Sequence, residues 1–469
     1  MSRDEPESDV ADVDLLVSGG DVVTMNPRRE VLVGGTVAIA GNQIVAVGST
    51  SELRDRYRGA HVLDATQCVI TPGLVNAHEH LTGDPLVRSC IPDLLPPGAS
   101  VFEWSVPFHA AHTGDIDELS ALLASLEALH YGVTTVIEAG TVAHPDRTGT
   151  AMTTAGIRGS IGRWGWDIEG APFSFPAAEV LALEREMCEA WPRGGRVEAW
   201  VTLVGHNLAS DELLAGAADL ARDLGTNMTM HMSPTSSDPE SYLAAHGRRP
   251  IRHLNELGVL GPHLVIAHGV WLDDEEIELI LDTRTAIAYC PWAYLRTAQG
   301  VTRVGRHAEI VERGGRVALG CDASNAGDLA DILRTAAVAA AIGRDTRIDP
   351  MTFGAAAVFE LATINGAEAI GMADRIGSIE VGKLADLAIH DTRNITWTPP
   401  GDHALHLVWG TDGRTIRDVI VDGEIVLRDR KSTKVDELSL IDEAKKAQAE
   451  IFASAGITPQ PTWPLVGAD

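Results

Sequence analysis

The chain has 469 residues, 45% of them hydrophobic, which is enough to bury the core of one large domain and a smaller one. Its net charge of −29 repels phosphate backbones and anionic lipid head groups, so nucleic acid and membrane surfaces are excluded as partners. The acidic N-terminal residues lack the apolar segment of a signal peptide, and no apolar run reaches membrane-spanning length. We therefore expect a cytoplasmic protein.

The five cysteines are far apart in the sequence and form no C-x-x-C pair. This spacing argues against a disulfide framework and against a cysteine-based zinc site. They are expected to be small core residues.

Both ends of the chain contain short apolar segments separated by Gly or Asn-Pro turns, a pattern typical of β-strands. The expected strands are 14–17, 21–25, 36–39, 44–48, 382–389, 416–421 and 423–427. Because the two ends of a compact chain often lie close together, we predict one small β-sandwich domain built from residues 1–70 and 376–432.

Residues 71–375 contain strand-length apolar runs that alternate with helical stretches, as expected for parallel strands with crossover helices. The expected strands are 69–75, 134–137, 157–161, 197–203, 227–231, 264–268, 285–290 and 316–320. Eight such strands in roughly 300 residues predict an α/β fold with a closed (β/α)8 TIM-like barrel, whose active site lies at the carboxyl ends of the strands.

The last segment, 433–469, is predicted to be a helix and a tail. Apolar residues recur there with helical spacing, which predicts a helix from Val435 to Ala455. We expect this helix to pack at a subunit interface of a homodimer or higher homo-oligomer.

Two histidines at the end of the first barrel strand suggest a metal site. His78 and His80 alternate along the strand and therefore share one face. His231 and His268 end two later strands, and Asp322 follows the last one, so all five side chains are expected at one rim of the barrel. Imidazoles and a carboxylate that leave one coordination position open are typical of a catalytic metal site.

With these motifs the chain resembles the metal-dependent amidohydrolase superfamily, in the branch that contains cytosine deaminase and the triazine hydrolases. The resemblance rests on the segments 72–80, 267–272, 320–322 and 377–387 and on the N-terminal β-segments. It implies that His78, His80, His231 and Asp322 bind the metal, that His268 polarises the substrate, and that Asp322 also accepts the proton of the attacking water.

The chemistry of these groups supports the same roles. A divalent cation lowers the pKa of bound water to about 7 and so provides metal-bound hydroxide at neutral pH. Asp322 can pass the proton of this water to a leaving group, and His268 can hold the developing oxyanion. Zinc is the expected ion, although iron, cobalt or manganese also suit such ligands.

The number of metal ions follows from the absence of lysine. Many superfamily members bridge two ions with a carboxylated lysine at the end of strand four, but the first lysine of this chain is Lys383. We therefore predict one ion per chain; a glutamate bridge, for instance from Glu138, is the remaining alternative.

Pro234 marks a departure from the branch. Enzymes that deaminate or dechlorinate aromatic rings usually have glutamate three residues after the strand-five histidine, where it protonates a ring nitrogen, and this chain has Pro234. We therefore predict hydrolysis of an acyclic carbon–nitrogen bond in an amide, urea or carbamate, for which superfamily hydrolases of phenylureas and thiocarbamates are the nearest precedent. The alternatives are an aromatic deaminase or dechlorinase with another acid, and a non-enzymatic scaffold, against which the complete ligand set argues.

The substrate is expected to be a small aromatic or apolar molecule, because several tryptophans lie beside strand ends. The residues predicted to contact it are Trp104, Trp164, Trp166, His206, Trp292 and Asn325. Asn325 has a second interpretation as the cap of the following helix.

Overall fold

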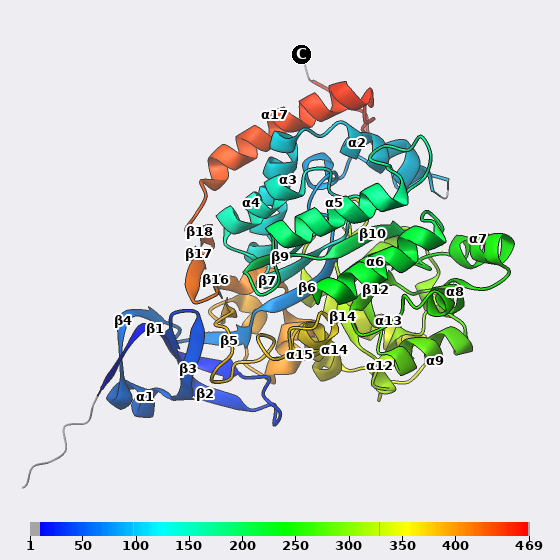
Figure 1. Cartoon of the computed structure of the whole chain (residues 1–469). Helices are drawn as coiled ribbons and strands as arrows, with labels where there is room; N and C mark the ends of the chain where they lie inside the picture. The colour runs from blue at the N-terminus through cyan, green and yellow to red at the C-terminus, as the bar shows by residue number, and fades with distance from the viewer. Residues whose placement is uncertain (1–9, 97, 328, 468–469) are drawn as a thin grey trace, which may run out of the picture.

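The computed structural model describes residues 10–96, 98–327 and 329–467, and its elements form two parts (Figure 1). One part is a mixed β-sheet that contains strands from both ends of the chain. The other consists of parallel strands surrounded by helices. No helix among the described residues combines the length and apolar character needed to cross a bilayer.

The mixed sheet has nine strands within the described residues, and its order is β18-β17-β16-β15-β5-β1-β2-β3, with β4 paired to β1. The strands are β1 (Ala11–Val23), β2 (Val31–Ala40), β3 (Gln43–Ser49), β4 (Tyr57–Asp64), β5 (Cys68–Pro72), β15 (Leu387–Asp391), β16 (Ile416–Val421), β17 (Glu424–Arg428) and β18 (Lys431–Ser432). Its core includes Val17, Ile39, Ile70, Leu387 and Ile420. The two ends of the chain thus share one sheet, as predicted.

The parallel strands form two sheets, β6-β7-β8-β9 and β10-β11-β12-β13-β14. Their bounds are β6 (Leu74–Glu79), β7 (Val133–Glu138), β8 (Arg158–Ile161), β9 (Val197–Ala199), β10 (Val201–Gly205), β11 (Met228–Met232), β12 (Leu264–His268), β13 (Ala286–Tyr289) and β14 (Val317–Leu319). Only Trp200 separates β9 from β10, and the backbone N–H of Cys321, just after β14, donates to the carbonyl of His78. Eight strand positions in cyclic order agree with a (β/α)8 barrel.

Helices connect and cover the strands of both parts (Figure 1). They are α1 (Thr50–Arg56), α2 (Val106–Ala110), α3 (Gly114–His130), α4 (Pro145–Ala155), α5 (Ala177–Ala190), α6 (Asp211–Leu224), α7 (Ser237–His246), α8 (Pro250–Glu256), α9 (Asp274–Thr283), α10 (Pro291–Arg296), α11 (Val301–Val304), α12 (His307–Glu312), α13 (Ile332–Asp345), α14 (Ala355–Leu361), α15 (Ile364–Ala369), α16 (His403–Leu405) and α17 (Glu437–Ala455).

The segment expected as a first barrel strand, 69–75, divides between the two parts. β5 belongs to the mixed sheet, where Leu387 pairs with Pro72, and β6 starts the barrel after Gly73. A Cβ atom at Gly73 would lie 2.0 Å from the hydroxyl oxygen of Thr134. The close approach of the Thr134 side chain therefore requires glycine at this bend.

The C-terminal helix α17 lies along α2 and α3, as the predicted packing requires (Figure 1). Leu440, Ala447 and Ile451 form its buried face. Its role in an oligomer stays a prediction.

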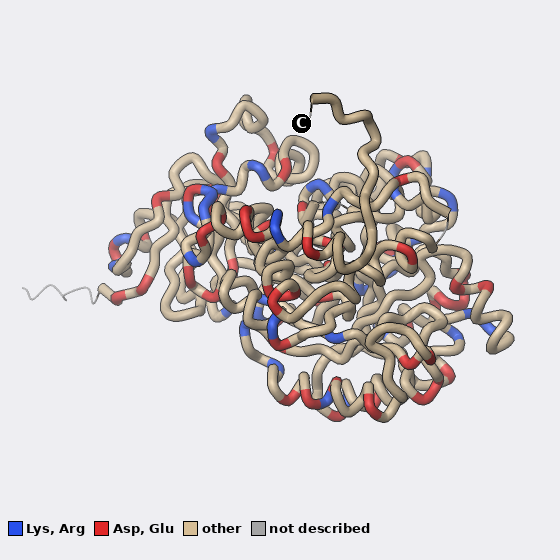
Figure 2. The backbone as a smooth tube through the Cα atoms, turned by 90° about the horizontal axis from the view of Figure 1, so that it is seen from above, with Lys and Arg blue, Asp and Glu red and all other residues tan. Residues whose placement is uncertain are grey.

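Charged residues of both signs alternate over the surface helices (Figure 2). Many of them form ion pairs, such as that of Arg313 with Glu278.

Candidate active site

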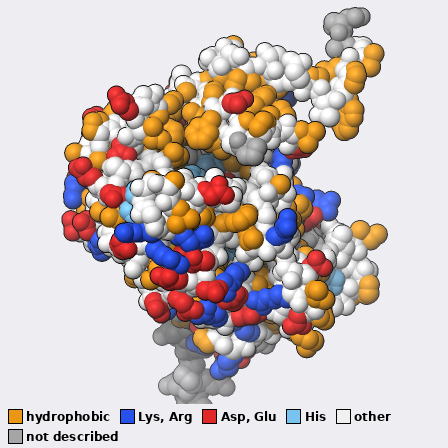
Figure 3. Space-filling model, turned by 90° about the vertical axis from the view of Figure 1, so that its right-hand side faces the viewer, with side chains coloured by type: hydrophobic (Ala, Val, Ile, Leu, Met, Phe, Trp, Pro, Cys, Tyr) orange, Lys and Arg blue, Asp and Glu red, His pale blue; other side chains and the backbone are white. Residues whose placement is uncertain are grey.

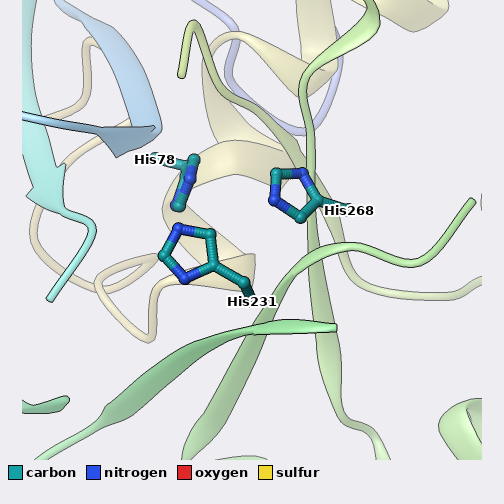
Figure 4. A group of neighbouring side chains, drawn as sticks. All are labelled: His78, His231 and His268. Atoms are coloured by element: carbon teal, nitrogen blue, oxygen red, sulfur yellow. The ribbon is translucent and has the colours of Figure 1, made fainter. Parts of the chain in front are cut away.

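Five of the predicted side chains meet at the carboxyl ends of the barrel strands. His78 and His80 come from the end of β6, His231 from β11, His268 ends β12, and Asp322 follows β14. In Figure 4 the imidazoles of His78, His231 and His268 point toward one another from these separate strands. The convergence that the strand pattern predicted is therefore present.

The distances between donor atoms suit a shared ion. His80 Nε2 lies 3.4 Å from Asp322 Oδ1, and His78 Nε2 lies 3.7 Å from the same oxygen. His231 Nε2 lies 3.4 Å from His80 Nε2. Two ligands at the usual bond lengths of a tetrahedral zinc ion are about 3.4 Å apart.

Unpartnered nitrogens support the same fit. Both ring nitrogens of the buried His78, and Nδ1 of His268, have no hydrogen-bond partner. Buried polar atoms normally have partners, and a divalent ion would satisfy those that face the cluster. Burial lowers the pKa of His78 well below its ordinary value, so its imidazole is in the neutral form that binds metals.

Neighbouring groups fix the orientation of two imidazoles. His231 Nδ1 donates to the carbonyl oxygen of Val204 at 2.7 Å, which leaves Nε2 directed at the cluster. His80 Nδ1 lies 2.8 Å from the hydroxyl of Thr141. Such outer contacts are the usual means of holding metal-binding histidines in place.

Asp322 is an ionised carboxylate within this group of imidazoles. Burial raises its pKa, but the hydrogen bond with His80 and the nearby histidines outweigh burial and hold the pKa well below its usual value. His268 Nδ1 lies 4.0 Å from Asp322 Oδ2. His268 is as close to the cluster as the other histidines.

Three site residues have left-handed backbone conformations. The φ angles are 55° at His206, 84° at His268 and 68° at Asp322, a region that residues other than glycine rarely adopt. Strained backbone of this kind is concentrated at functional sites, where it directs side chains that a regular strand would turn away.

His206 and Asp238 form a pair beside the cluster. His206 Nδ1 lies 2.9 Å from Asp238 Oδ2, and the His206 ring stacks on that of His231 with centroids 5.6 Å apart. The backbone N–H of Ser233 donates to the same oxygen of Asp238. Burial lowers the pKa of His206, but the Asp238 carboxylate outweighs burial and raises it overall. His206 was predicted from the sequence, whereas Asp238, which lies on α7 without a recognisable motif, was not.

The predicted tryptophans fall into different environments. Trp164 and Trp166 pack together with centroids 5.2 Å apart, and the backbone N–H of Trp164 donates to the carbonyl of Val142, next to Thr141. Trp104 instead packs against Phe108, in the cluster that includes α17. The guanidinium of Arg334 lies 4.2 Å above the Trp292 ring. Trp164 is thus linked to the cluster through the backbone of Val142 and its neighbour Thr141, and Trp166 packs against Trp164.

Asn325 holds a loop. Its side-chain oxygen accepts from the backbone N–H groups of Cys90 and Ile91, and its amide donates to the carbonyl of Val87. The following helix, α13, is capped by Asp331, so the interpretation of Asn325 as a helix cap is wrong.

His109 on α2 was also missed by sequence reasoning. Its ring lies 4.9 Å from Trp164 and fills the space where a Cβ atom of Gly83 would lie, at 2.2 Å from Nε2. The H-x-x-H spacing of His109 and His112 was the only available signal.

These features define a class of α/β hydrolases with a metal site at the ends of parallel strands, and comparisons with known proteins identify the family. The family model described as the amidohydrolase family matches residues 69–426. The chain belongs to this family. It is a metal-dependent hydrolase that acts on carbon–nitrogen bonds, and its assignment to the branch of cytosine deaminase and the triazine hydrolases is confirmed.

Two curated relatives are similar over almost their whole length. A 5-methylthioadenosine/S-adenosylhomocysteine deaminase of Syntrophobacter fumaroxidans is 31% identical, over 91% of this chain and 96% of the relative. A 5'-deoxyadenosine deaminase of Methanothermobacter thermautotrophicus is 31% identical, over 93% of this chain and 98% of the relative.

Two solved structures have the same fold. An adenosine deaminase from Xanthomonas campestris with bound zinc has a TM-score of 0.90 and 26% identity, covering 95% of this chain and 100% of the other. An atrazine chlorohydrolase from Arthrobacter aurescens TC1 complexed with zinc has a TM-score of 0.85 and 24% identity, covering 92% of this chain and 100% of the other, a likeness of fold alone. Zinc in the adenosine deaminase structure supports a divalent metal for the His/Asp cluster of this chain.

Proposed function

We propose that the protein hydrolytically deaminates an amino-substituted heteroaromatic ring of the adenine type. The observation that carries this proposal is His206, held by Asp238 and stacked on His231, at the edge of the cluster. The deaminases among the relatives support it. This reaction is the alternative to the acyclic carbon–nitrogen cleavage predicted from Pro234.

His78, His80, His231 and Asp322 would hold the metal ion. An ion bound there would lower the pKa of water to about 7 and so supply hydroxide at neutral pH. One ion is proposed for this cluster, because lysine is absent before Lys383 and the Glu138 carboxylate accepts hydrogen bonds from the backbone N–H groups of Gly140 and Thr141.

Asp322 and His268 divide the proton transfer and the charge stabilisation between them. The ionised Asp322 carboxylate accepts the proton of the attacking water and passes it to the departing ammonia. His268 Nδ1 lies 4.0 Å from Asp322 Oδ2. From this position the imidazole stabilises the tetrahedral intermediate by a hydrogen bond.

We assign to His206 the role of the missing acid. Attack on an aromatic ring carbon places negative charge on the adjacent ring nitrogen, which needs a hydrogen-bond donor. Pro234 has no such donor. His206 Nδ1 donates to the Asp238 carboxylate, and no described residue hydrogen-bonds its Nε2. In the imidazolium form, which Asp238 favours against burial by raising the pKa of His206, Nε2 carries a proton and can donate it to the ring nitrogen.

A second candidate is cleavage of an acyclic urea, amide or carbamate, which Pro234 favours. The carbonyl oxygen of such a substrate receives the negative charge itself, so no ring nitrogen needs a proton. The leaving group would be an amine instead of ammonia.

The two candidates differ in their products. We would incubate the zinc-loaded protein with adenosine, 5'-deoxyadenosine, 5-methylthioadenosine and a phenylurea, and measure ammonia and aniline release. Ammonia from a purine substrate is the expected result, and the His206→Ala variant should lower kcat/KM by about 10²-fold to 10⁴-fold. A matched control is His130→Ala, which removes a partly exposed histidine bonded to Glu437. Aniline release from the phenylurea with no ammonia from any of the purine substrates would contradict deamination and support the second candidate.

A further inference from the structure

We propose that the chain has a second divalent metal site, formed by Asp211, His246 and His253 and separate from the barrel cluster. Asp211 begins α6, His246 ends α7 and His253 lies in α8. These helices belong to successive strand–helix units and lie on the right in Figure 1. The site goes beyond the proposed function and does not depend on it.

The atoms of the three side chains that could bind a metal ion lie close together. One donor atom of each lies within 4.8 Å of the other two. His253 Nε2 lies 2.7 Å from Asp211 Oδ1, and the two imidazole centroids are 4.0 Å apart. Donors around a tetrahedral ion are about 3.4 Å apart, so small rotations of Asp211 and His246 bring the set to a suitable spacing.

The second metal site is open to solvent on the side of Asp211. The Asp211 side chain is 51% exposed, whereas that of His253 is only 5% exposed and provides a fixed ligand. His246 Nε2 donates a hydrogen bond to the amide oxygen of Asn207 at 3.3 Å, which orients the His246 ring. An ion from solution can therefore enter from the Asp211 side and keep water in a remaining position.

The charges around the site favour a cation. The nearby arginines pair with other carboxylates: Arg248 with Glu256, Arg249 with Glu276 and Arg252 with Asp273. No Lys or Arg of the described ranges forms an ion pair with Asp211, whose partner is His253. Figure 3 shows this side of the molecule, where arginines and carboxylates form a mixed band.

Two imidazoles and one carboxylate select the class of ion. Such ligands suit Zn²⁺, Ni²⁺ or Cu²⁺, whereas Mg²⁺ and Ca²⁺ prefer oxygen ligands alone. The cluster differs in this respect from the surface pairs of one histidine with one carboxylate, such as His403 with Asp21.

Tyr242 connects this site to the barrel cluster. Its hydroxyl donates to the backbone carbonyl of His206 at 2.7 Å, and its ring contacts those of His246 and His253 at 5.3 and 5.7 Å. Asn207 is the neighbour of His206 in the sequence. An ion at the second site would therefore tie α7 and α8 to the loop that carries His206.

The test is a calorimetric titration of Ni²⁺ into the holoprotein with its barrel cluster already loaded. The wild type is expected to bind one further ion, and His246→Ala and Asp211→Asn to lose this binding. The matched control is His403→Ala, which removes an imidazole bonded to the Asp21 carboxylate at 3.0 Å and should bind Ni²⁺ like the wild type. With Cu²⁺ in place of Ni²⁺, the electron paramagnetic resonance spectrum should show nitrogen coupling that His246→Ala reduces.

Two results would overturn the proposal: a wild-type holoprotein that binds no further ion, or a folded His246→Ala variant that binds it with unchanged affinity. Circular dichroism of each variant establishes that it is folded. The titration uses no substrate, so a failure of the proposed deaminase activity would leave its result intact.

Discussion

Asp322 combines a position beside three imidazoles with a carboxylate that stays ionised. We predict that Asp322→Asn lowers kcat/KM by about 10²-fold to 10⁴-fold, because an amide cannot accept the water proton and deliver it to the leaving group. Steady-state kinetics on the variant, with its metal content determined on the same sample, would measure this.

The metal content of Asp322→Asn distinguishes two possible causes of lost turnover. A variant that keeps its ion but loses turnover supports the proton-transfer role of Asp322. Loss of both ion and turnover supports the ligand role alone, and normal turnover would contradict the proposed mechanism.

Among the individual site residues, those that could be predicted from the sequence are the ones whose position follows from the order of the strands. His78, His231 and His268 end parallel strands, and such ends meet at one rim whatever the loops do. Asp238 and His109 lie on helices after irregular loops, and their approach to the site depends on packing that has no local pattern. Asn325 shows the same limit, since its partners on the 87–91 loop are more than 230 positions away in the sequence.

At the scale of elements, a buried ion pair joins the barrel to the mixed sheet. Arg158 on β8 donates from Nε to Asp386 Oδ2 at 2.6 Å, and its Nη2 donates to Asp422. Both Arg158 and Asp386 are almost fully buried. We predict that Asp386→Ala lowers the free energy of unfolding by about 3–5 kcal/mol, because it leaves the buried guanidinium with one carboxylate fewer.

Urea denaturation of the variant and the wild type would measure this loss. Asp391→Ala is a suitable control, because Asp391 pairs with the largely exposed Arg393 and its removal should lower stability by about 1 kcal/mol or less. Equal effects of the two substitutions would contradict the link between the two parts.

The mixed sheet also contains a buried neutral histidine. His390 on β15 is fully buried between the hydroxyls of Thr71 and Thr415, and burial lowers its pKa from 6.5 to about 3. Below about pH 6.5 the unfolded chain binds a proton that the folded protein does not. The contribution of His390 to stability is therefore complete above pH 6.5 and is lost as pH falls toward 3, by up to about 1.4 kcal/mol per pH unit.

We predict that His390→Gln makes the melting temperature less sensitive to acid between pH 6.5 and 4.5. Thermal unfolding at several pH values would test this, with the difference between variant and wild type as the readout, because metal loss in acid affects both proteins. The control is His403→Gln, at a partly exposed histidine. If the melting temperatures of His390→Gln and the wild type fell in parallel with pH, His390 would not be the cause of the loss of stability in acid.

The bend at Gly73 shows what the sequence could predict about elements. The sequence predicted one strand over 69–75, and the structure divides this segment at Gly73 between β5 and β6. The membership of β5 in the mixed sheet was not predictable, because its partner β15 lies more than 300 residues later and both faces of β5 are buried.

At the scale of the whole molecule, the proposed metal ion would connect distant parts of the barrel. His78 lies on the first strand, His231 on the fifth and Asp322 after the last. An ion that binds only the folded protein adds about 4 kcal/mol at a free concentration of 1,000 times its Kd. With an unfolding entropy of roughly 1 kcal/mol/K for a chain of this length, chelation should lower the melting temperature by about 4 °C.

Differential scanning calorimetry before and after dialysis against a chelator would measure this shift, with metal removal verified on the same sample. Added Zn²⁺ should restore the original melting temperature in the wild type and restore it less in Asp322→Asn, which has a weaker ligand. Because His246→Ala leaves the barrel ligands in place, its melting temperature should still fall on chelation. A wild-type protein that loses its ion without any change in melting temperature would mean that the imidazoles at the barrel mouth are held by packing alone.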